Sequence, residues 1–108
     1  MAVGTIPNHN PTVISPIKNQ SYVGDGNVYV EKYGKMVVMV GRFNITTKKP
    51  SGQDNYLFKG FPSPKGYVAY VANGTGIGDL FINGNGQLTS NSEIQTGYIN
   101  VSCAYVCT

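Results

Sequence analysis

Hydrophobic and polar residues alternate along much of the chain after residue 21, with the two-residue period that is typical of β-strands. The longest such stretch is Met36–Thr47, and its odd positions form one apolar face: Val37, Met39, Phe43 and Ile45. The final stretch, Tyr98–Val106, has a similar face: Ile99, Val101, Cys103 and Tyr105. These faces are expected to pack in a shared core.

Turn residues divide the pattern into about seven strands. The ranges expected to be strands are Asn27–Tyr33, Met36–Thr47, Asn55–Gly60, Tyr67–Ala72, Asp79–Asn83, Gln87–Thr89 and Tyr98–Val106. Gly34-Lys35 and Gly84–Gly86 have the composition of hairpin turns. No segment shows a helical period. The sequence therefore predicts an all-β domain, a small antiparallel β-sandwich or jelly roll.

Residues 1–21 differ from the rest because they contain three prolines and no strand period. They are expected to form an N-terminal arm or linker, docked through Val13, Ile14 and Ile17, beside a head domain of residues 22–108. The even positions Met36, Val38 and Val40 are apolar as well. A small sandwich cannot bury both faces of one strand, so the second face is expected to meet another subunit.

Composition supports one small domain: 108 residues, 41% hydrophobic and 12% charged. The net charge is +3, but the basic residues are scattered and seven of the eight are lysine, which does not favour nucleic-acid binding. No apolar run approaches the length of a membrane span, and the first residues lack the pattern of a signal peptide. Cys103 and Cys107 would lie about 13 Å apart on one strand, too far for a disulfide, so free thiols are expected.

Residues for catalysis are sparse, because His9 is the lone histidine and the five carboxylates fall mostly in turns or at strand ends. No metal site, cofactor or enzymatic activity is predicted. Tyrosine is the more suggestive residue, since its flat ring and hydroxyl suit sugars and protein epitopes. Tyr22, Tyr33 and Tyr56 are candidates in or beside loops, whereas four others are expected to fill strands: Tyr29, Tyr67, Tyr70 and Tyr105.

The loops Lys48–Asp54 and Asn73–Gly78 are the predicted binding surface, because strands use their side chains for the core and the interface. Amine, amide, carboxylate, hydroxyl and aromatic groups there suit hydrogen bonding and stacking. Lysines would also attract anionic, phosphate-bearing polymers. The candidate ligand-binding residues are Lys48, Lys49, Gln53, Asp54, Tyr56, Asn73 and Thr75.

The chain resembles the C-terminal head of bacteriophage tail-fibre and receptor-binding proteins. Four segments carry the resemblance, in this order: NVYVEKYGKMVVMVGRF, LFKGFPSPKG, DLFINGNGQL and YINVSCAYV. The resemblance covers residues 22–108 and carries over no individual site residue. It implies a trimeric β-sandwich or jelly-roll head that binds a saccharide or protein on the host cell. It also implies a place on the virion, with synthesis in the bacterial cytoplasm and other tail proteins as partners. The alternatives are a structural virion protein, for decoration or tail assembly, and a small lectin-like module.

Overall fold

The computed structural model describes residues 10–73 and 79–108, which form two antiparallel five-stranded sheets without any helix. In chain order the strands are β1 (Thr12–Ile14), β2 (Ile17–Lys18), β3 (Val23–Tyr33), β4 (Met36–Ile45), β5 (Phe58–Lys59), β6 (Ala69–Tyr70), β7 (Ala72–Asn73), β8 (Phe81–Ile82), β9 (Gln87–Thr89) and β10 (Gly97–Val106). The first sheet has the order β1-β3-β4-β10-β7 and the second β2-β5-β9-β8-β6. The protein is therefore an all-β antiparallel sandwich, as the alternation predicted.

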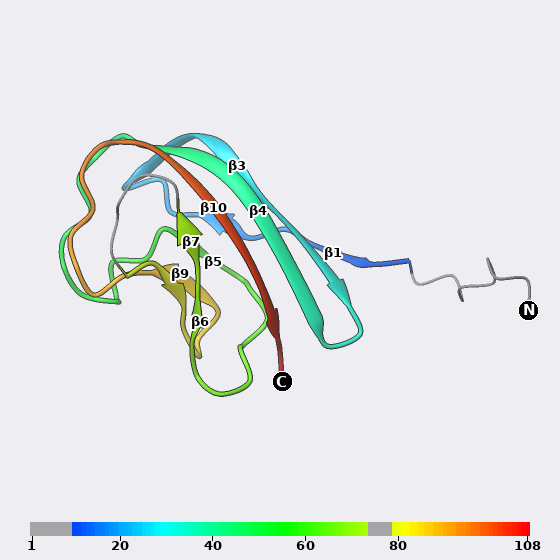
Figure 1. The fold of residues 1–108 in the computed structure, drawn as a ribbon. Helices are drawn as coiled ribbons and strands as arrows, with labels where there is room; N and C mark the ends of the chain where they lie inside the picture. Colours follow the sequence, from blue (N-terminus) through cyan, green and yellow to red (C-terminus); the bar gives the residue numbers. More distant parts are fainter. Residues whose placement is uncertain (1–9, 74–78) are drawn as a thin grey trace, which may run out of the picture.

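The three long strands β3, β4 and β10 lie side by side as one curved layer, and the short strands of the second sheet cover one side of it (Figure 1). The side chains that face the second sheet are the predicted apolar faces. In β4 they are all buried: Val37, Met39, Phe43 and Ile45. In β10 Ile99, Val101 and Tyr105 are buried, and Cys103 is partly buried against the core. Both predicted faces are confirmed.

The second sheet completes the core with short strands, four of which each place at least one buried apolar side chain against the first sheet. Phe58, Ile82 and Leu88 are fully buried. The rings of Phe43 and Phe58 meet edge to face between the two sheets, with 5.0 Å between their centroids. This geometry is the favoured one for an aromatic pair, so the contact helps to align the sheets.

The chain passes from one sheet to the other at both sides of the sandwich. Ala69–Tyr70 pair with β8 in the second sheet, and Ala72–Asn73 then pair with β10 in the first. On the opposite side β1 pairs with β3, and β2 pairs with β5 in the second sheet. Each crossing segment therefore ties the two layers together at an edge.

The expectation that residues 1–21 contain no strand is wrong, because β1 and β2 fall within them. Of the three side chains expected to dock, only Ile14 packs against the core, while Val13 and Ile17 are exposed. The pairing partners of β1 and β2 are edge residues of β3 and β5 that are distant in sequence. Pairing with an existing edge lets a proline-bounded segment become a strand without its own periodic pattern.

Each of the seven predicted ranges contains a strand, but the described chain has ten strands rather than about seven. Two of the additional strands are β1 and β2. The third arises because the range Tyr67–Ala72 divides between β6 and β7, which belong to different sheets. The two predicted hairpin turns are confirmed: Gly34 and Gly86 have positive φ angles of 61° and 73°. At Gly86 a Cβ atom would lie 2.3 Å from the carbonyl oxygen of Phe61, so glycine is required there.

Candidate functional site

The side of the first sheet that faces away from the second sheet carries an unusual number of exposed apolar residues. We call this side the outer face. Tyr29 exposes 68% of its surface and Val40 exposes 52%. The apolar patch of the outer face consists of Val13, Tyr29, Tyr33, Met36, Val38, Val40 and Val106. It includes the even positions of β4 that were expected to meet another subunit.

Strand register makes the patch continuous across β3, β4 and β10. Tyr29 lies opposite Val40, and Tyr33 lies opposite Met36. Val106 lies on the other side of Met36, and Ala104 lies beside Val38. Side chains directly opposite each other on one face of an antiparallel sheet are about 5 Å apart and in contact range. The exposed apolar residues therefore form one surface rather than scattered single side chains.

A groove of about 310 Å³ runs along this patch where the chain leaves β1 for β2. Val13 and Pro16 form one wall, and Tyr29 and Val40 belong to the other. The groove exists because β1 pairs with β3 only through residues 12–14, after which the chain turns toward the second sheet. Concave apolar surfaces of this size are typical places for a partner or ligand to dock.

Glu31 is the one acidic residue within the lining of the groove. The Tyr33 hydroxyl donates a hydrogen bond of 3.1 Å to its Oε1 atom. This bond, together with the negative charge of Glu31, raises the pKa of Tyr33. Both side chains are exposed, so this hydrogen-bonded pair places one polar group on a largely apolar surface.

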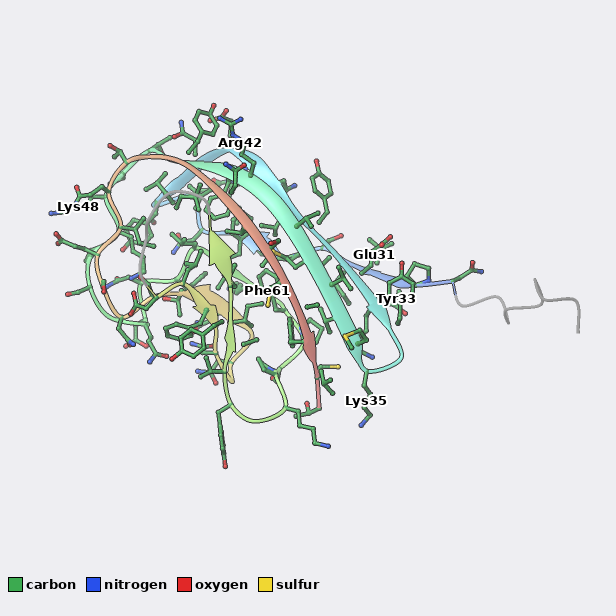
Figure 2. All side chains as sticks on the ribbon, in the orientation of Figure 1. Glu31, Tyr33, Lys35, Arg42, Lys48 and Phe61 are labelled. Carbon is green, nitrogen blue, oxygen red and sulfur yellow. The ribbon has the colours of Figure 1, made fainter. Side chains whose placement is uncertain are left out.

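The predicted binding loop lies elsewhere, at the end of the sandwich where residues 48–56 meet residues 90–95. We call this region the loop end. Backbone hydrogen bonds join Lys49 with Ile94 and Gly52 with Asn91. Figure 2 places Lys48 far from Tyr33 and Lys35 at the tip of the β3–β4 hairpin. The loop end and the apolar patch are thus separate surfaces.

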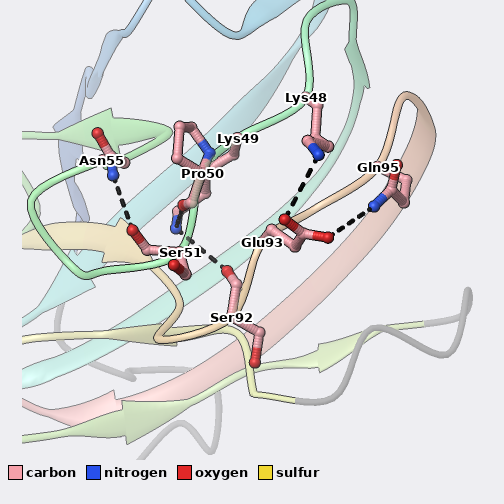
Figure 3. A network of polar contacts seen from close by, with 8 residues as sticks. All are labelled: Lys48, Lys49, Pro50, Ser51, Asn55, Ser92, Glu93 and Gln95. Carbon is pink, nitrogen blue, oxygen red and sulfur yellow. Dashed lines mark hydrogen bonds and ion pairs between the residues drawn. The ribbon is translucent and has the colours of Figure 1, made fainter.

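Four of the predicted residues lie together at the loop end with their side chains at least partly accessible: Lys48, Gln53, Asp54 and Tyr56. The Lys48 ammonium forms an ion pair of 3.5 Å with Glu93 (Figure 3). The Gln53 amide donates a 3.0 Å hydrogen bond to Oδ1 of Asn91. The Lys59 ammonium lies 5.8 Å from the centre of the Tyr56 ring. These residues present polar and aromatic groups to solvent, as a recognition surface requires.

Lys49 was also predicted to bind ligand, but its side chain is not part of this accessible surface. Its relative exposure is 0%. The ammonium donates hydrogen bonds to the carbonyl oxygens of four residues at distances of 2.8–3.3 Å: Pro50, Gly52, Ser90 and Ser92. Burial lowers the pKa of Lys49, while the charge of Asp79 opposes this shift. The buried Lys49 ammonium therefore links the loop of residues 48–56 to the loop of residues 90–95 by hydrogen bonds.

The signal for this role was weak in the sequence. Lys49 continues the inward odd positions of β4, which is the one feature that distinguishes it from Lys48. The four carbonyl groups that surround its ammonium come from two loops about 40 residues apart, as the separations of 41 and 43 residues to Ser90 and Ser92 show. Only the folded arrangement brings them together.

The second predicted loop is only partly described. Asn73 is the last residue of β7 and pairs with Val101, so it belongs to a strand and not to a loop. Thr75 lies outside the described residues. Among the tyrosines expected to fill strands, Tyr105 is buried, but Tyr29 and Tyr70 are exposed on strands and Tyr67 is exposed outside one. Their neighbours in the alternating pattern explain this, since Val28, Val30 and Ala69 take the inward positions.

Comparisons with protein-family models, with curated proteins and with solved structures found no match for this chain. Within residues 10–73 and 79–108, no helix has the length and apolar character to cross a membrane. The same ranges bring together no group of three or more side chains of the kinds that usually hold a metal ion. The apolar patch and the loop end are two surface features that bear on function.

Proposed function

We propose that this protein is a non-enzymatic receptor-binding head of the phage tail-fibre kind, which recognises a saccharide or protein on the host cell. The observation that carries the proposal is the apolar patch on a domain whose core is otherwise well covered. Contiguous apolar surface on the order of several hundred Å² marks an interaction site in soluble proteins. The resemblance of residues 22–108 to phage heads supplies the kind of assembly and the biological setting.

In this proposal the patch is the contact between three copies of the chain. Homotrimerisation covers Tyr29, Val38 and Val40, which a monomer would leave in water. The number three comes from the family resemblance. Light scattering of the purified chain tests this step, because a trimer is expected at micromolar concentration. A clean monomer at that concentration would contradict it.

The loop end is the proposed receptor-binding surface. It lies apart from the patch, so assembly leaves its side chains accessible. Lys48, Gln53 and Asp54 supply hydrogen-bonding groups, and Tyr56 supplies an aromatic face. Recognition by loops on a rigid β-scaffold is a common arrangement, because the strands hold the loops in place.

Binding of labelled protein to host cells tests the proposed function. The unmodified chain is expected to label cells, and the triple variant Lys48→Ala, Asp54→Ala, Tyr56→Ala is expected to label them far less. The triple variant should keep its oligomeric state and melting temperature, since none of the three side chains is buried. A chain that binds virions and ignores cells would instead indicate a structural virion protein.

A further inference from the structure

The outer face has a second, polar half beyond Val40. Asn27 and Asn100 lie on either side of Arg42, in one row across β3, β4 and β10. In the next row Tyr98 lies opposite Asn44. We call this surface the polar platform, and its six residues are Asp25, Asn27, Arg42, Asn44, Tyr98 and Asn100. All except the half-buried Asn44 are exposed.

Arg42 is the only arginine in the chain, and the platform holds it in a defined position. Its guanidinium carbon lies 4.5 Å from the centre of the Tyr98 ring, a cation–π contact. The guanidinium makes no hydrogen bond or ion pair with any residue in the described part of the chain. Its planar set of N–H donors is therefore oriented by the ring and available to a ligand. Such a set matches the geometry of a carboxylate or phosphate.

Asp25 is brought to the same place by an irregularity in β3. The register with β4 shifts between Val23 and Gly26, which is the mark of a β-bulge. Gly26 has a φ angle of 93°, and a Cβ atom there would lie 2.3 Å from the carbonyl oxygen of Arg42. From this bulge Asp25 reaches across β4, and its Oδ2 accepts a 2.5 Å hydrogen bond from the Tyr98 hydroxyl. Bulges often re-aim a side chain at a functional position.

The environment keeps Asp25 ionised. The hydrogen bond from the Tyr98 hydroxyl lowers the pKa of this carboxyl group, and the same bond raises the pKa of Tyr98. A carboxylate accepts hydrogen bonds through several lone pairs, so one engaged oxygen leaves capacity for others. Acceptors on Asp25 therefore stand beside donors on Arg42, Asn27 and Asn100.

We propose that the polar platform binds an acidic saccharide, a sugar that carries a carboxylate or phosphate together with free hydroxyl groups. Arg42 pairs with the acidic group, while Asp25 accepts hydrogen bonds from the hydroxyls and the asparagine amides complete the contact. Arg42 lies two residues from Val40 on the same face, about 7 Å away, so the site borders the proposed assembly surface. This inference rests on the proposed function, because it adds a second receptor contact to the loop end and names the class of sugar that this contact takes.

The test is a titration of the isotope-labelled full chain, followed by the chemical shifts of its backbone amides. Glucuronic acid and glucose 6-phosphate represent the two sources of the acidic group, and glucose is the neutral control. Shifts are expected at residues 25–27, 42–44 and 98–100 with one or both acidic sugars, and much weaker shifts with glucose. The arm that gives the tighter binding identifies carboxylate or phosphate as the preferred group.

Matched variants separate a specific site from general charge. Arg42→Gln is expected to weaken binding about tenfold or more, because charge-assisted hydrogen bonds are lost. Lys65→Gln removes the same charge at an exposed position outside both the platform and the loop end and is expected to leave the affinity unchanged. Arg42→Lys keeps the charge without the planar donors and should bind between the two. The amide spectrum of each variant also shows directly whether it is folded.

Three results would overturn the inference: no shifts on the platform, equal binding of glucose, or equal losses in Arg42→Gln and Lys65→Gln. These outcomes are distinguishable from failure of the proposed function. If the unmodified chain labels cells but no acidic sugar binds the platform, the inference alone is wrong. If the sugars bind and cells are not labelled, the receptor-binding function is wrong and the sugar site stands.

Discussion

The apolar patch and the loop end differ in which side chains they expose and which they bury. On the outer face, Tyr29 and Val40 remain exposed although they are large and apolar. At the loop end, the charged Lys49 is completely buried. The difference arises because the described part of the chain supplies hydrogen-bond acceptors for the Lys49 ammonium but no covering side chains for the outer face. The loops surround the Lys49 ammonium with four carbonyl oxygens, whereas residues 10–73 and 79–108 form no third layer over the first sheet.

Residue type alone is therefore a poor guide to burial in this molecule. A buried charge is tolerated when hydrogen bonds replace the water that it loses. An exposed apolar face is tolerated when something outside the monomer covers it. One substitution at the loop end and three on the outer face test this contrast.

The largest effect is expected from Lys49→Ala. The substitution leaves four buried or partly buried carbonyl groups without their shared donor, and each such loss costs about 1–3 kcal/mol. Because water will reach some of these groups, we expect the free energy of unfolding to fall by about 4 kcal/mol. Urea denaturation measures this. The control Lys48→Ala, which breaks an exposed ion pair, should cost less than about 1 kcal/mol. Equal effects of the two variants would mean that Lys49 is not an internal tie.

Val38→Lys is expected to act on the outer face without unfolding the domain. In the assembled state it would place an unpaired charge in an apolar contact, which costs roughly 3–5 kcal/mol. The trimer should therefore dissociate at micromolar concentration, and light scattering would show a monomer. Thr47→Lys is the control, because it adds the same charge at an exposed position outside the patch. Persistence of the assembly in Val38→Lys would place the interface elsewhere.

Gly26→Ala is expected to disturb the polar half of the outer face. The alanine would have to adopt a positive φ angle, and its Cβ would approach the backbone of Arg42 and Phe43 within 2.3–2.5 Å. We expect a loss of about 2 kcal/mol or more in the free energy of unfolding. At Gly34 no atom lies within 4 Å of an added Cβ. The variant Gly34→Asn, which tolerates a positive φ angle, should therefore be nearly neutral. A neutral Gly26→Ala would argue against the bulge.

Tyr98→Phe should have the smallest effect, visible mainly as a change in pH dependence. In the folded protein the pKa of Asp25 is lowered and that of Tyr98 is raised by their hydrogen bond. The Asp25 contribution to stability is therefore present at neutral pH and lost as the pH falls through its folded pKa. The Tyr98 contribution is lost as the pH rises through its own folded pKa.

Melting temperatures of Tyr98→Phe and the unmodified chain, compared from acid to alkaline pH, test this expectation. The small advantage of the unmodified chain should be present at neutral pH and absent at both extremes. Tyr29→Phe is the control on the same face, because the Tyr29 hydroxyl has no hydrogen-bond partner in the described residues. The same pH profile for both variants would rule out a role of the Asp25–Tyr98 pair.

Much of the fold followed from local pattern. The inward faces of β4 and β10 and the turns at Gly34 and Gly86 were predicted correctly, because strand alternation and positive φ angles are properties of neighbouring residues. The short strands β1 and β2 were missed, since each pairs through only two or three residues with a distant edge. The split between β6 and β7 was missed for a similar reason. No local pattern states which sheet a two-residue strand will join.

The candidate site was predicted less well, again for physical reasons. Lys48, Gln53, Asp54 and Tyr56 lie together because they are near in sequence and occupy one loop. Lys49 was misplaced because its acceptors come from a second loop. The platform of Asp25, Arg42 and Tyr98 was not anticipated at all. It depends on a bulge and on the order of three strands, and neither can be predicted from the local sequence pattern.

The sequence by itself determined that this chain forms an antiparallel all-β domain with one strongly apolar face on each long strand. It also determined that β4 carries apolar residues on both faces, which is the origin of the apolar patch. Only the tertiary structure decided that Lys49 is internal, that a groove opens beside Tyr29, and that Asp25 reaches Tyr98 across β4. The reason is that alternation depends on adjacent residues, whereas burial and contact depend on which distant segments arrive to supply partners.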